Sequence, residues 1–224
     1  MPDSTDAGPA PEFEAASVDR SNSLARVARG LAALPAGVAP SREMLADLRL
    51  GWDNDEWSAD LDYLEELAER AARVSGPILE CGSGMTTILL STLAAKRGVE
   101  VWSFEHSPEW YLYAAAAICQ LKLPLINLCL RPIRDYREFH WYALPEATLP
   151  RGFALIVCDG PPGTTKGGRY GLWPLLSGHF APSAVIMLDD TNREKERAVL
   201  DRWVKASGGK TRVQGRFATL TLPR

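Results

Sequence analysis

The sequence lacks the features that would place it in a membrane or on a nucleic acid. No stretch reaches the roughly 18 consecutive apolar residues that a membrane span needs, and no basic segment followed by an apolar run opens the chain. Lysine and arginine (25) do not outnumber aspartate and glutamate (28), and the formal net charge is -3 at pH 7. We therefore expect a cytoplasmic protein whose partners include neither a membrane nor a phosphate backbone.

Cysteine is scarce and unpaired in the sequence. The four cysteines form no CxxC pair, and three of them lie inside apolar, strand-like runs: Cys81, Cys119, Cys129 and Cys158 are the complete set. This pattern favours buried free thiols over disulfides or zinc ligands.

What is present is the composition of a globular protein, with 46% hydrophobic and 24% charged residues. A chain of 224 residues suits one α/β domain with a tail. Residues 1–22 are rich in Pro, Ala, Ser and acids without any period, which predicts a disordered tail. Residues 23–76 predict a helical extension with helices at 24–34 and 58–74, and residues 77–224 carry the main domain.

Short apolar strands alternate with helices after Gly76, as in a parallel sheet covered on both faces. The pattern predicts an α/β fold with a mostly parallel seven-stranded sheet and a C-terminal antiparallel strand. The expected strands are 78–81, 99–105, 126–130, 154–159, 184–189, 211–216 and 217–222. The expected helices among them are 86–97, 108–121, 171–179 and 193–207.

The segment PILECGSGMTT, residues 77–87, predicts a strand, a tight glycine loop and a helix start. Gly82 and Gly84 let the backbone turn sharply and approach a ligand closely. Glu105 stands 21 residues beyond Gly84, at the end of the next expected strand, where a carboxylate can accept hydrogen bonds from two ribose hydroxyls. Together these features predict a nucleoside-binding site.

The loop favours S-adenosylmethionine over a dinucleotide. A dinucleotide site uses GxGxxG, whereas Thr87 occupies the position of the third glycine. Glu80, on the strand side of the loop, would repel a pyrophosphate and attract the ammonium group of a methionine moiety.

ILECGSGMTT and VWSFEHS resemble the first two motifs of class I S-adenosylmethionine-dependent methyltransferases. ALIVCDGPPG and AVIMLDDTNRE resemble the later motifs, so the resemblance covers about residues 57 to 222. It implies a Rossmann-like three-layer sandwich that binds S-adenosylmethionine, but it does not identify the acceptor. Our main hypothesis is methyl transfer to an oxygen of a small molecule or sugar. A non-catalytic nucleoside-binding protein and an NAD-dependent oxidoreductase are the alternatives.

The resemblance also implies a set of cofactor contacts. The amino acid end of the cofactor would meet the glycine loop, the ribose would meet Glu105, and the base would lie near the residues after the second and third strands. The implied cofactor-binding residues are Glu80, Gly82, Ser83, Gly84, Thr86, Glu105, His106, Asp135 and Tyr136. The face of Trp57 could stabilise the sulfonium, although packing of this ring onto the sheet explains it equally well.

Acidic residues end the fourth and fifth strands of the expected parallel series. Asp159, Asp189 and Asp190 would converge there, because ligands of such sheets bind at the carboxyl ends of the strands. Asp159 and Asp190 are the catalytic candidates, with Asp159 accepting a proton from the acceptor. Alternatively, the acids ligate a divalent cation. The DGPPG and DDTNR segments resemble the metal-ligating positions of cation-dependent O-methyltransferases of the catechol and xylan glucuronic acid types, but the usual Asp-Asn pair is Asp189-Asp190 here.

Two local patterns compete with these assignments. Thr191 and Glu194 match a capping box that begins a helix, and Asp190 would then only support the cap. The GPPGTTKGGRYG loop predicts either a surface turn or a substrate wall in which Lys166 and Arg169 meet a carboxylate or phosphate of the acceptor.

Overall fold

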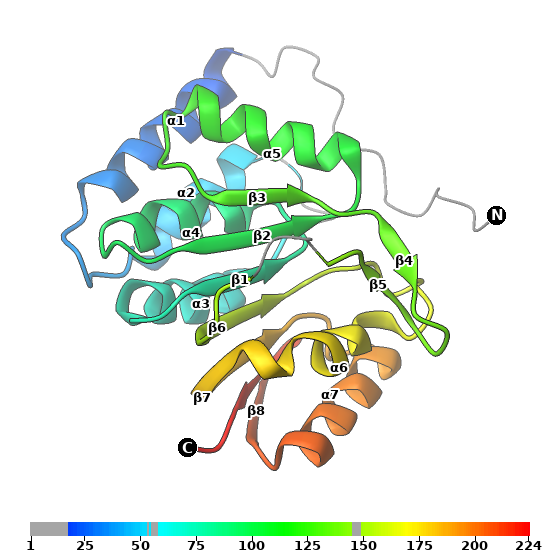
Figure 1. Ribbon diagram of the computed structural model, residues 1–224. Helices are drawn as coiled ribbons and strands as arrows, with labels where there is room; N and C mark the ends of the chain where they lie inside the picture. Colours follow the sequence, from blue (N-terminus) through cyan, green and yellow to red (C-terminus); the bar gives the residue numbers. More distant parts are fainter. Residues whose placement is uncertain (1–17, 53, 55–57, 145–148) are drawn as a thin grey trace.

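A seven-stranded sheet forms the centre of the computed structural model, which describes residues 18–52, 54, 58–144 and 149–224. The strand order is β3-β2-β1-β6-β7-β9-β8, and β9 runs in the direction opposite to the other six strands (Figure 1). The strands are β1 Ile78–Cys81, β2 Val101–Glu105, β3 Asn127–Leu130, β6 Phe153–Cys158, β7 Phe180–Leu188, β8 Lys210–Gln214 and β9 Phe217–Thr221. The predicted α/β architecture is therefore confirmed.

Helices cover both faces of this sheet, as the alternation of strands and helices predicts. The helices are α1 Val18–Ala33, α2 Arg42–Trp52, α3 Leu61–Arg73, α4 Met85–Ala95, α5 Pro108–Gln120, α6 Leu172–Leu176 and α7 Glu194–Ser207. Ser107 caps α5 by accepting a hydrogen bond from the Trp110 N–H, and Pro108 occupies its first turn, as expected. No helix in the described part of the chain combines the length and apolar character that crossing a bilayer requires.

Successive strand residues pack into different cores, because side chains alternate between the two faces of a strand. Ile78, Leu155 and Val157 join the cluster formed with α1 to α5. Leu79 and Ile156 join the cluster formed with α6 and α7 on the other face. The molecule thus has three layers with an apolar core on each side of the sheet.

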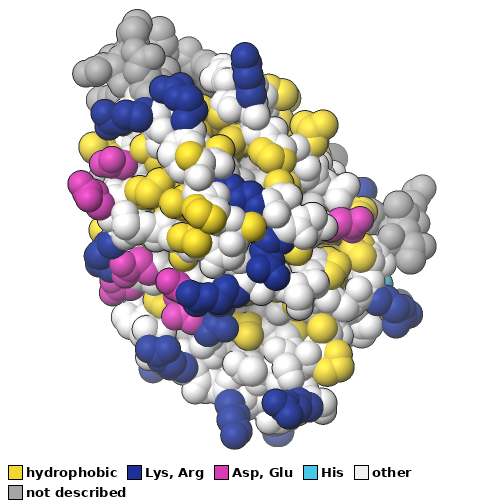
Figure 2. Space-filling model, turned by 90° about the vertical axis from the view of Figure 1, so that its left-hand side faces the viewer, with side chains coloured by type: hydrophobic (Ala, Val, Ile, Leu, Met, Phe, Trp, Pro, Cys, Tyr) yellow, Lys and Arg dark blue, Asp and Glu magenta, His cyan; other side chains and the backbone are white. Residues whose placement is uncertain are grey.

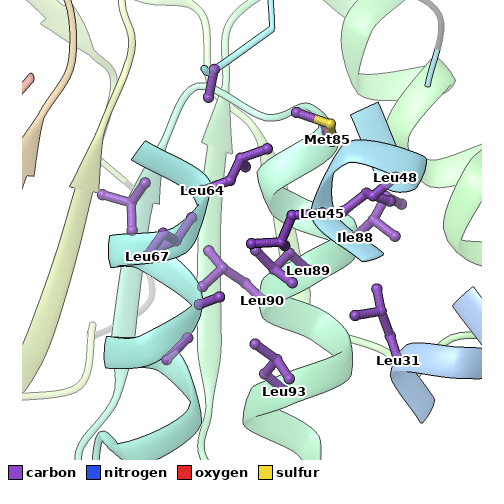
Figure 3. Packing of buried hydrophobic residues seen from close by; sticks show 14 of the residues in the cluster. Leu31, Leu45, Leu48, Leu64, Leu67, Met85, Ile88, Leu89, Leu90 and Leu93 are labelled. Carbon is purple, nitrogen blue, oxygen red and sulfur yellow. The ribbon is translucent and has the colours of Figure 1, made fainter. Parts of the chain in front are cut away.

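The N-terminal helices belong to the first of these cores. Figure 3 shows Leu31, Leu45 and Leu64, from α1, α2 and α3, directed toward α4. Residues 85 to 94 of α4 are buried on all sides, as expected for a helix that is apolar all round. The helical extension therefore packs as a continuation of the main domain.

The structure adds elements that the sequence patterns did not predict. These are α2 and a hairpin of two three-residue strands, β4 Ile133–Asp135 and β5 His140–Tyr142, which are too short for a clear alternation of apolar residues. The helix expected at 171–179 divides into α6 and two 3₁₀ turns, Gly168–Gly171 and Ser177–His179. In addition, α1 begins at Val18, within the predicted tail.

Figure 2 shows the face at the amino ends of the parallel strands. Lysine and arginine side chains are spread among apolar ones on this face and do not gather into one basic patch. The opposite edge of the sheet, where the strands end, holds the site.

We predict that Leu45→Ala lowers the free energy of unfolding by about 2 to 5 kcal/mol in a single transition, because Leu45 is fully buried in the core shared with α4. Leu50→Ala in the same helix is the control, since Leu50 is 73% exposed and should change stability by about 0.5 kcal/mol or less. Urea denaturation followed by circular dichroism measures both. A separate early transition in Leu45→Ala would show that the N-terminal helices fold apart from the sheet.

Candidate functional site

A cavity of about 590 Å³ opens at the carboxyl ends of the parallel strands. It brings together residues from the glycine loop, the end of β2 and the ends of β6 and β7. The predicted site residues that line it are Gly82, Ser83, Gly84, Glu105, His106, Asp159 and Asp190. One cavity therefore contains half of the predicted cofactor contacts and both catalytic candidates.

The glycine loop crosses closely over the loop that follows β6. Gly82 has a φ of +92°, and a Cβ placed on it would lie 2.9 Å from the Gly160 backbone nitrogen. A Cβ on Gly160 would in turn lie 2.3 Å from the hydroxyl oxygen of Tyr142. A side chain at either position would force the two loops apart, so both glycines are required by geometry.

Glu80 lies beneath the loop rather than on the cavity wall. Its carboxylate accepts hydrogen bonds from Thr86 Oγ1 (2.6 Å), Thr87 Oγ1 (2.7 Å) and the Ser103 hydroxyl, and it is fully buried. Burial raises the pKa of Glu80 to about 7, although these three hydrogen bonds act in the opposite direction. Glu80 and Thr86 thus fix the start of α4, and neither is among the residues that line the cavity.

Glu105 joins the glycine loop to the end of β2. One carboxylate oxygen accepts hydrogen bonds from the Ser83 N–H and hydroxyl, both at 2.9 Å. The other accepts from the N–H groups of His106 (2.7 Å) and Ser107 (2.9 Å). Burial would raise the pKa of Glu105, but the His106 side chain and these backbone donors outweigh it and hold the pKa below its ordinary value.

Aromatic rings that sequence reasoning did not assign form another wall of the cavity. Trp52, Trp110 and Tyr142 line it, and Tyr113 packs edge to face against both tryptophans. Trp52 ends α2, a helix that the sequence patterns missed. The predicted aromatic contact, Trp57, lies outside the described residues.

Asp135 and Tyr136 lie in the β4–β5 hairpin region and do not line the cavity. Asp135 accepts a hydrogen bond from the Arg137 N–H at 2.6 Å, and its side chain is 65% exposed. Tyr136 stacks on Phe139 with ring centroids 5.6 Å apart. Their assignment to the adenine stays a prediction that this arrangement does not favour.

The strand-end acids converge as predicted, and Arg169 lies between them. Its Nη2 donates to Asp159 Oδ1 at 3.0 Å and to Asp190 Oδ2 at 2.8 Å, while its Nη1 donates to the Asp189 carbonyl at 2.7 Å. Arg169 is only 2% exposed. Its guanidinium pairs with internal acids, an arrangement that does not favour the predicted contact with an anionic acceptor.

Two further arginines complete this network. Arg216, from the turn between β8 and β9, contacts both oxygens of Asp189 at 3.0 and 2.8 Å and Asp190 Oδ1 at 3.1 Å. Arg193 pairs with Asp190 Oδ2 at 3.0 Å. Burial and the nearby Asp189 raise the pKa of Asp159 to about 7, and Arg169 limits the rise.

The capping box predicted at residues 191 to 194 is wrong. The N-cap of α7 is Arg193, without a side-chain cap, and Thr191 Oγ1 is buried with no hydrogen-bond partner in the described part of the chain. Asp190 serves the arginine network instead. The reason is tertiary, because Arg216 and Arg169 reach this turn from distant segments.

The acidic end of the cavity does not fit a divalent cation. Such an ion needs free oxygen ligands, whereas Asp159, Asp189 and Asp190 already receive guanidinium hydrogen bonds. Residues 18–52, 54, 58–144 and 149–224 contain no group of three or more His, Cys, Asp or Glu arranged to hold a metal ion.

Solved structures resemble this arrangement over most of the chain. A methyltransferase from Podospora anserina with S-adenosylhomocysteine bound is 15% identical, with a TM-score of 0.57 over 97% of this chain and 99% of its own. A Staphylococcus aureus protein assigned as a caffeoyl-CoA O-methyltransferase is 14% identical, with a TM-score of 0.56 over 82% and 92%. A tRNA methyltransferase from Aquifex aeolicus is 15% identical, with a TM-score of 0.52 over 86% and 83%.

The fold is that of the class I S-adenosylmethionine-dependent methyltransferases. No protein-family model and no curated protein sequence matches the chain. Caffeoyl-CoA and tRNA belong to different classes of molecule, so the acceptor has to be argued from the chemistry of the cavity.

Glu80→Gln should flatten the pH dependence of stability. The carboxyl titrates near 4.5 when exposed and near 7 in the folded protein, so between these values the folded state keeps a proton that the unfolded state releases. The contribution of Glu80 to stability is therefore greatest below pH 4.5 and is lost as the pH rises toward 7. Urea denaturation between about pH 5 and about pH 8 should show a smaller loss of stability in Glu80→Gln than in the wild type.

The exposed Glu109 on α5 supplies the control for this experiment. Glu109→Gln should keep the wild-type slope, because Glu109 is solvated in both states. Equal slopes in Glu80→Gln and the wild type would contradict the assignment of the buried proton to Glu80.

Proposed function

We propose that this protein is an enzyme that binds S-adenosylmethionine in the cavity and transfers its methyl group to a hydroxyl oxygen of a small molecule. The observation that carries this proposal is that Glu105 and Asp159 line the same cavity from opposite sides of the glycine crossing. A ribose-binding acid and a proton acceptor thus stand on either side of the place where a methyl group would be transferred.

The cofactor would occupy the half of the cavity formed by α4, β2 and α5. Its amino acid end would lie against Gly82 and Gly84, where no side chain intrudes, and its ribose hydroxyls would donate to Glu105, sharing the carboxylate with Ser83. The base would extend toward His106 and Trp110. The low pKa of Glu105 keeps it an ionised acceptor at neutral pH.

The acceptor would occupy the half of the cavity formed by the ends of β6 and β7. In the reaction the acceptor oxygen attacks the methyl carbon, the bond from that carbon to sulfur breaks, and S-adenosylhomocysteine leaves. The hydroxyl proton passes to Asp159, whose pKa of about 7 suits a general base near neutral pH. Placement of the two reactants supplies most of the acceleration, because a displacement at carbon needs no covalent enzyme intermediate.

Isothermal titration with S-adenosylhomocysteine tests the cofactor site. The wild type should bind it, and Glu105→Gln should bind roughly 10- to 150-fold more weakly, the loss expected for a hydrogen bond to a charged group of about 1.5 to 3 kcal/mol. Glu109→Gln, which removes the same charge from the exposed surface of α5, should bind like the wild type. Tighter binding of NADH than of S-adenosylhomocysteine would instead favour an oxidoreductase.

Asp159→Asn should abolish methyl transfer and leave the affinity for S-adenosylhomocysteine unchanged, because Asp159 lies on the acceptor side. Transfer is measured with methyl-labelled S-adenosylmethionine on a panel of phenols and sugars. In the wild type, kcat/KM should rise with pH and level off above about pH 7, as Asp159 loses its proton. Full activity in Asp159→Asn would remove Asp159 from the mechanism, and binding without transfer to any acceptor would favour a non-catalytic protein.

A further inference from the structure

Each carboxylate at the ends of β6 and β7 pairs with a guanidinium group. Three carboxylates, Asp159, Asp189 and Asp190, meet three guanidinium groups, those of Arg169, Arg193 and Arg216. The arginines come from three separate segments, namely the 3₁₀ turn after the GPPG loop, the N-cap of α7 and the turn between β8 and β9. Such pairing lowers the cost of holding several carboxylates close together in a largely buried place.

Arg169 occupies the place between the strand ends where a cation shared by the acids would sit. A single nitrogen, Nη2, lies 3.0 Å from an oxygen of Asp159 at the end of β6 and 2.8 Å from an oxygen of Asp190 at the end of β7. A metal ion ligated by both residues would have to displace this nitrogen.

Displacement of Arg169 would be costly. Its side chain is 2% exposed, and an expelled guanidinium would lose its hydrogen bonds to Asp159, Asp190 and the Asp189 carbonyl. Burial by itself would lower the pKa of Arg169, but Asp159 and the neighbouring acids raise it above its ordinary value, so the group stays charged. Arg216 likewise makes Asp189 unavailable to a metal ion, because it contacts both carboxylate oxygens of this fully buried residue.

We propose that Arg169 is a positioning residue that acts in place of a divalent cation, bridging Asp159 and Asp190 and making the acceptor site independent of metal ions. Arg216 and Arg193 complete the neutralisation. The role of Asp159 in this inference rests on the proposed function, whereas the exclusion of metal ions does not.

Manganese alone is the probe, because its binding is measured without knowledge of the acceptor. The full-length protein, loaded with S-adenosylhomocysteine, is titrated with Mn²⁺ and free ion is measured by electron paramagnetic resonance. The wild type should show no stoichiometric site, and a chelator should leave its melting temperature unchanged.

Removal of a guanidinium should uncover a cation site. Arg169→Gln and Arg216→Gln should each gain a Mn²⁺ site that is roughly tenfold or more tighter than any weak binding by the wild type. Mn²⁺ should also raise the melting temperatures of both variants. The gain should disappear when Asp190→Asn is added. Arg212→Gln is the matched control, since it removes the same charge from an exposed position on β8 of the same hairpin and should gain nothing.

Arg169→Lys separates charge from packing. Lysine keeps the positive charge but lacks the planar guanidinium and its second nitrogen, which contacts the Asp189 carbonyl. This variant should therefore exclude Mn²⁺ as the wild type does, even though its packing differs. A purely structural role for Arg169 would make Arg169→Lys and Arg169→Gln alike in Mn²⁺ binding, and that result would overturn the proposal.

Two further results would also overturn it. One is stoichiometric Mn²⁺ binding by the wild type that Asp159→Asn or Asp190→Asn abolishes. The other is the absence of any gain in Mn²⁺ affinity in Arg216→Gln. The Arg216 side chain is half-buried at the rim of the cavity, so this variant supplies the test if Arg169→Gln does not fold. If the proposed function is wrong, isothermal titration of the wild type with S-adenosylhomocysteine gives no heat of binding. That result is independent of the Mn²⁺ measurements.

Discussion

The contact of Arg169 with the ends of β6 and β7 is the constraint on which the proposed acceptor half of the cavity depends. Three carboxylates at neighbouring strand ends would repel one another in a site with little water. Arg169 and Arg216 hold them at hydrogen-bond distance and thereby fix the loops that carry them. Asp159 lies at the edge of this network, with its side chain 31% exposed, and so remains accessible from the cavity.

The cofactor half is fixed by a different kind of interaction. Glu80 receives hydroxyl hydrogen bonds from α4 and β2, and Glu105 receives donors from the glycine loop and from the residues that follow β2. These carboxylates tie the loop to two strands, while the crossing of Gly82 and Gly160 joins it to the acceptor half. The two halves are therefore held in one geometry, which is what an in-line transfer needs.

Local patterns were sufficient for much of this architecture. The alternation of apolar strands and helices predicted the sheet, because burial on both faces leaves a direct signature in the sequence. Ser107 and Pro108 predicted the start of α5, because a capping side chain and a proline mark a helix N-terminus locally. The short β4–β5 hairpin left no such signature. The capping box at 191–194 matched a local pattern, yet contacts of Asp190 with Arg169 and Arg216 prevailed over it.

By itself the sequence determined the glycine loop, the acid at Glu105 and the convergence of acids at the strand ends, since each follows from spacing along one or two neighbouring elements. Only the tertiary structure decided the charge state and availability of those groups. It buried Glu80 beneath the loop, brought Trp52 and Tyr142 to the cavity wall and placed Arg169, Arg193 and Arg216 on the acids. Arg193 lies only three residues from Asp190, but the contacts of Arg169 with Asp190 and of Arg216 with Asp189 and Asp190 join residues more than 20 positions apart. No local spacing encodes which distant cation neutralises a buried acid.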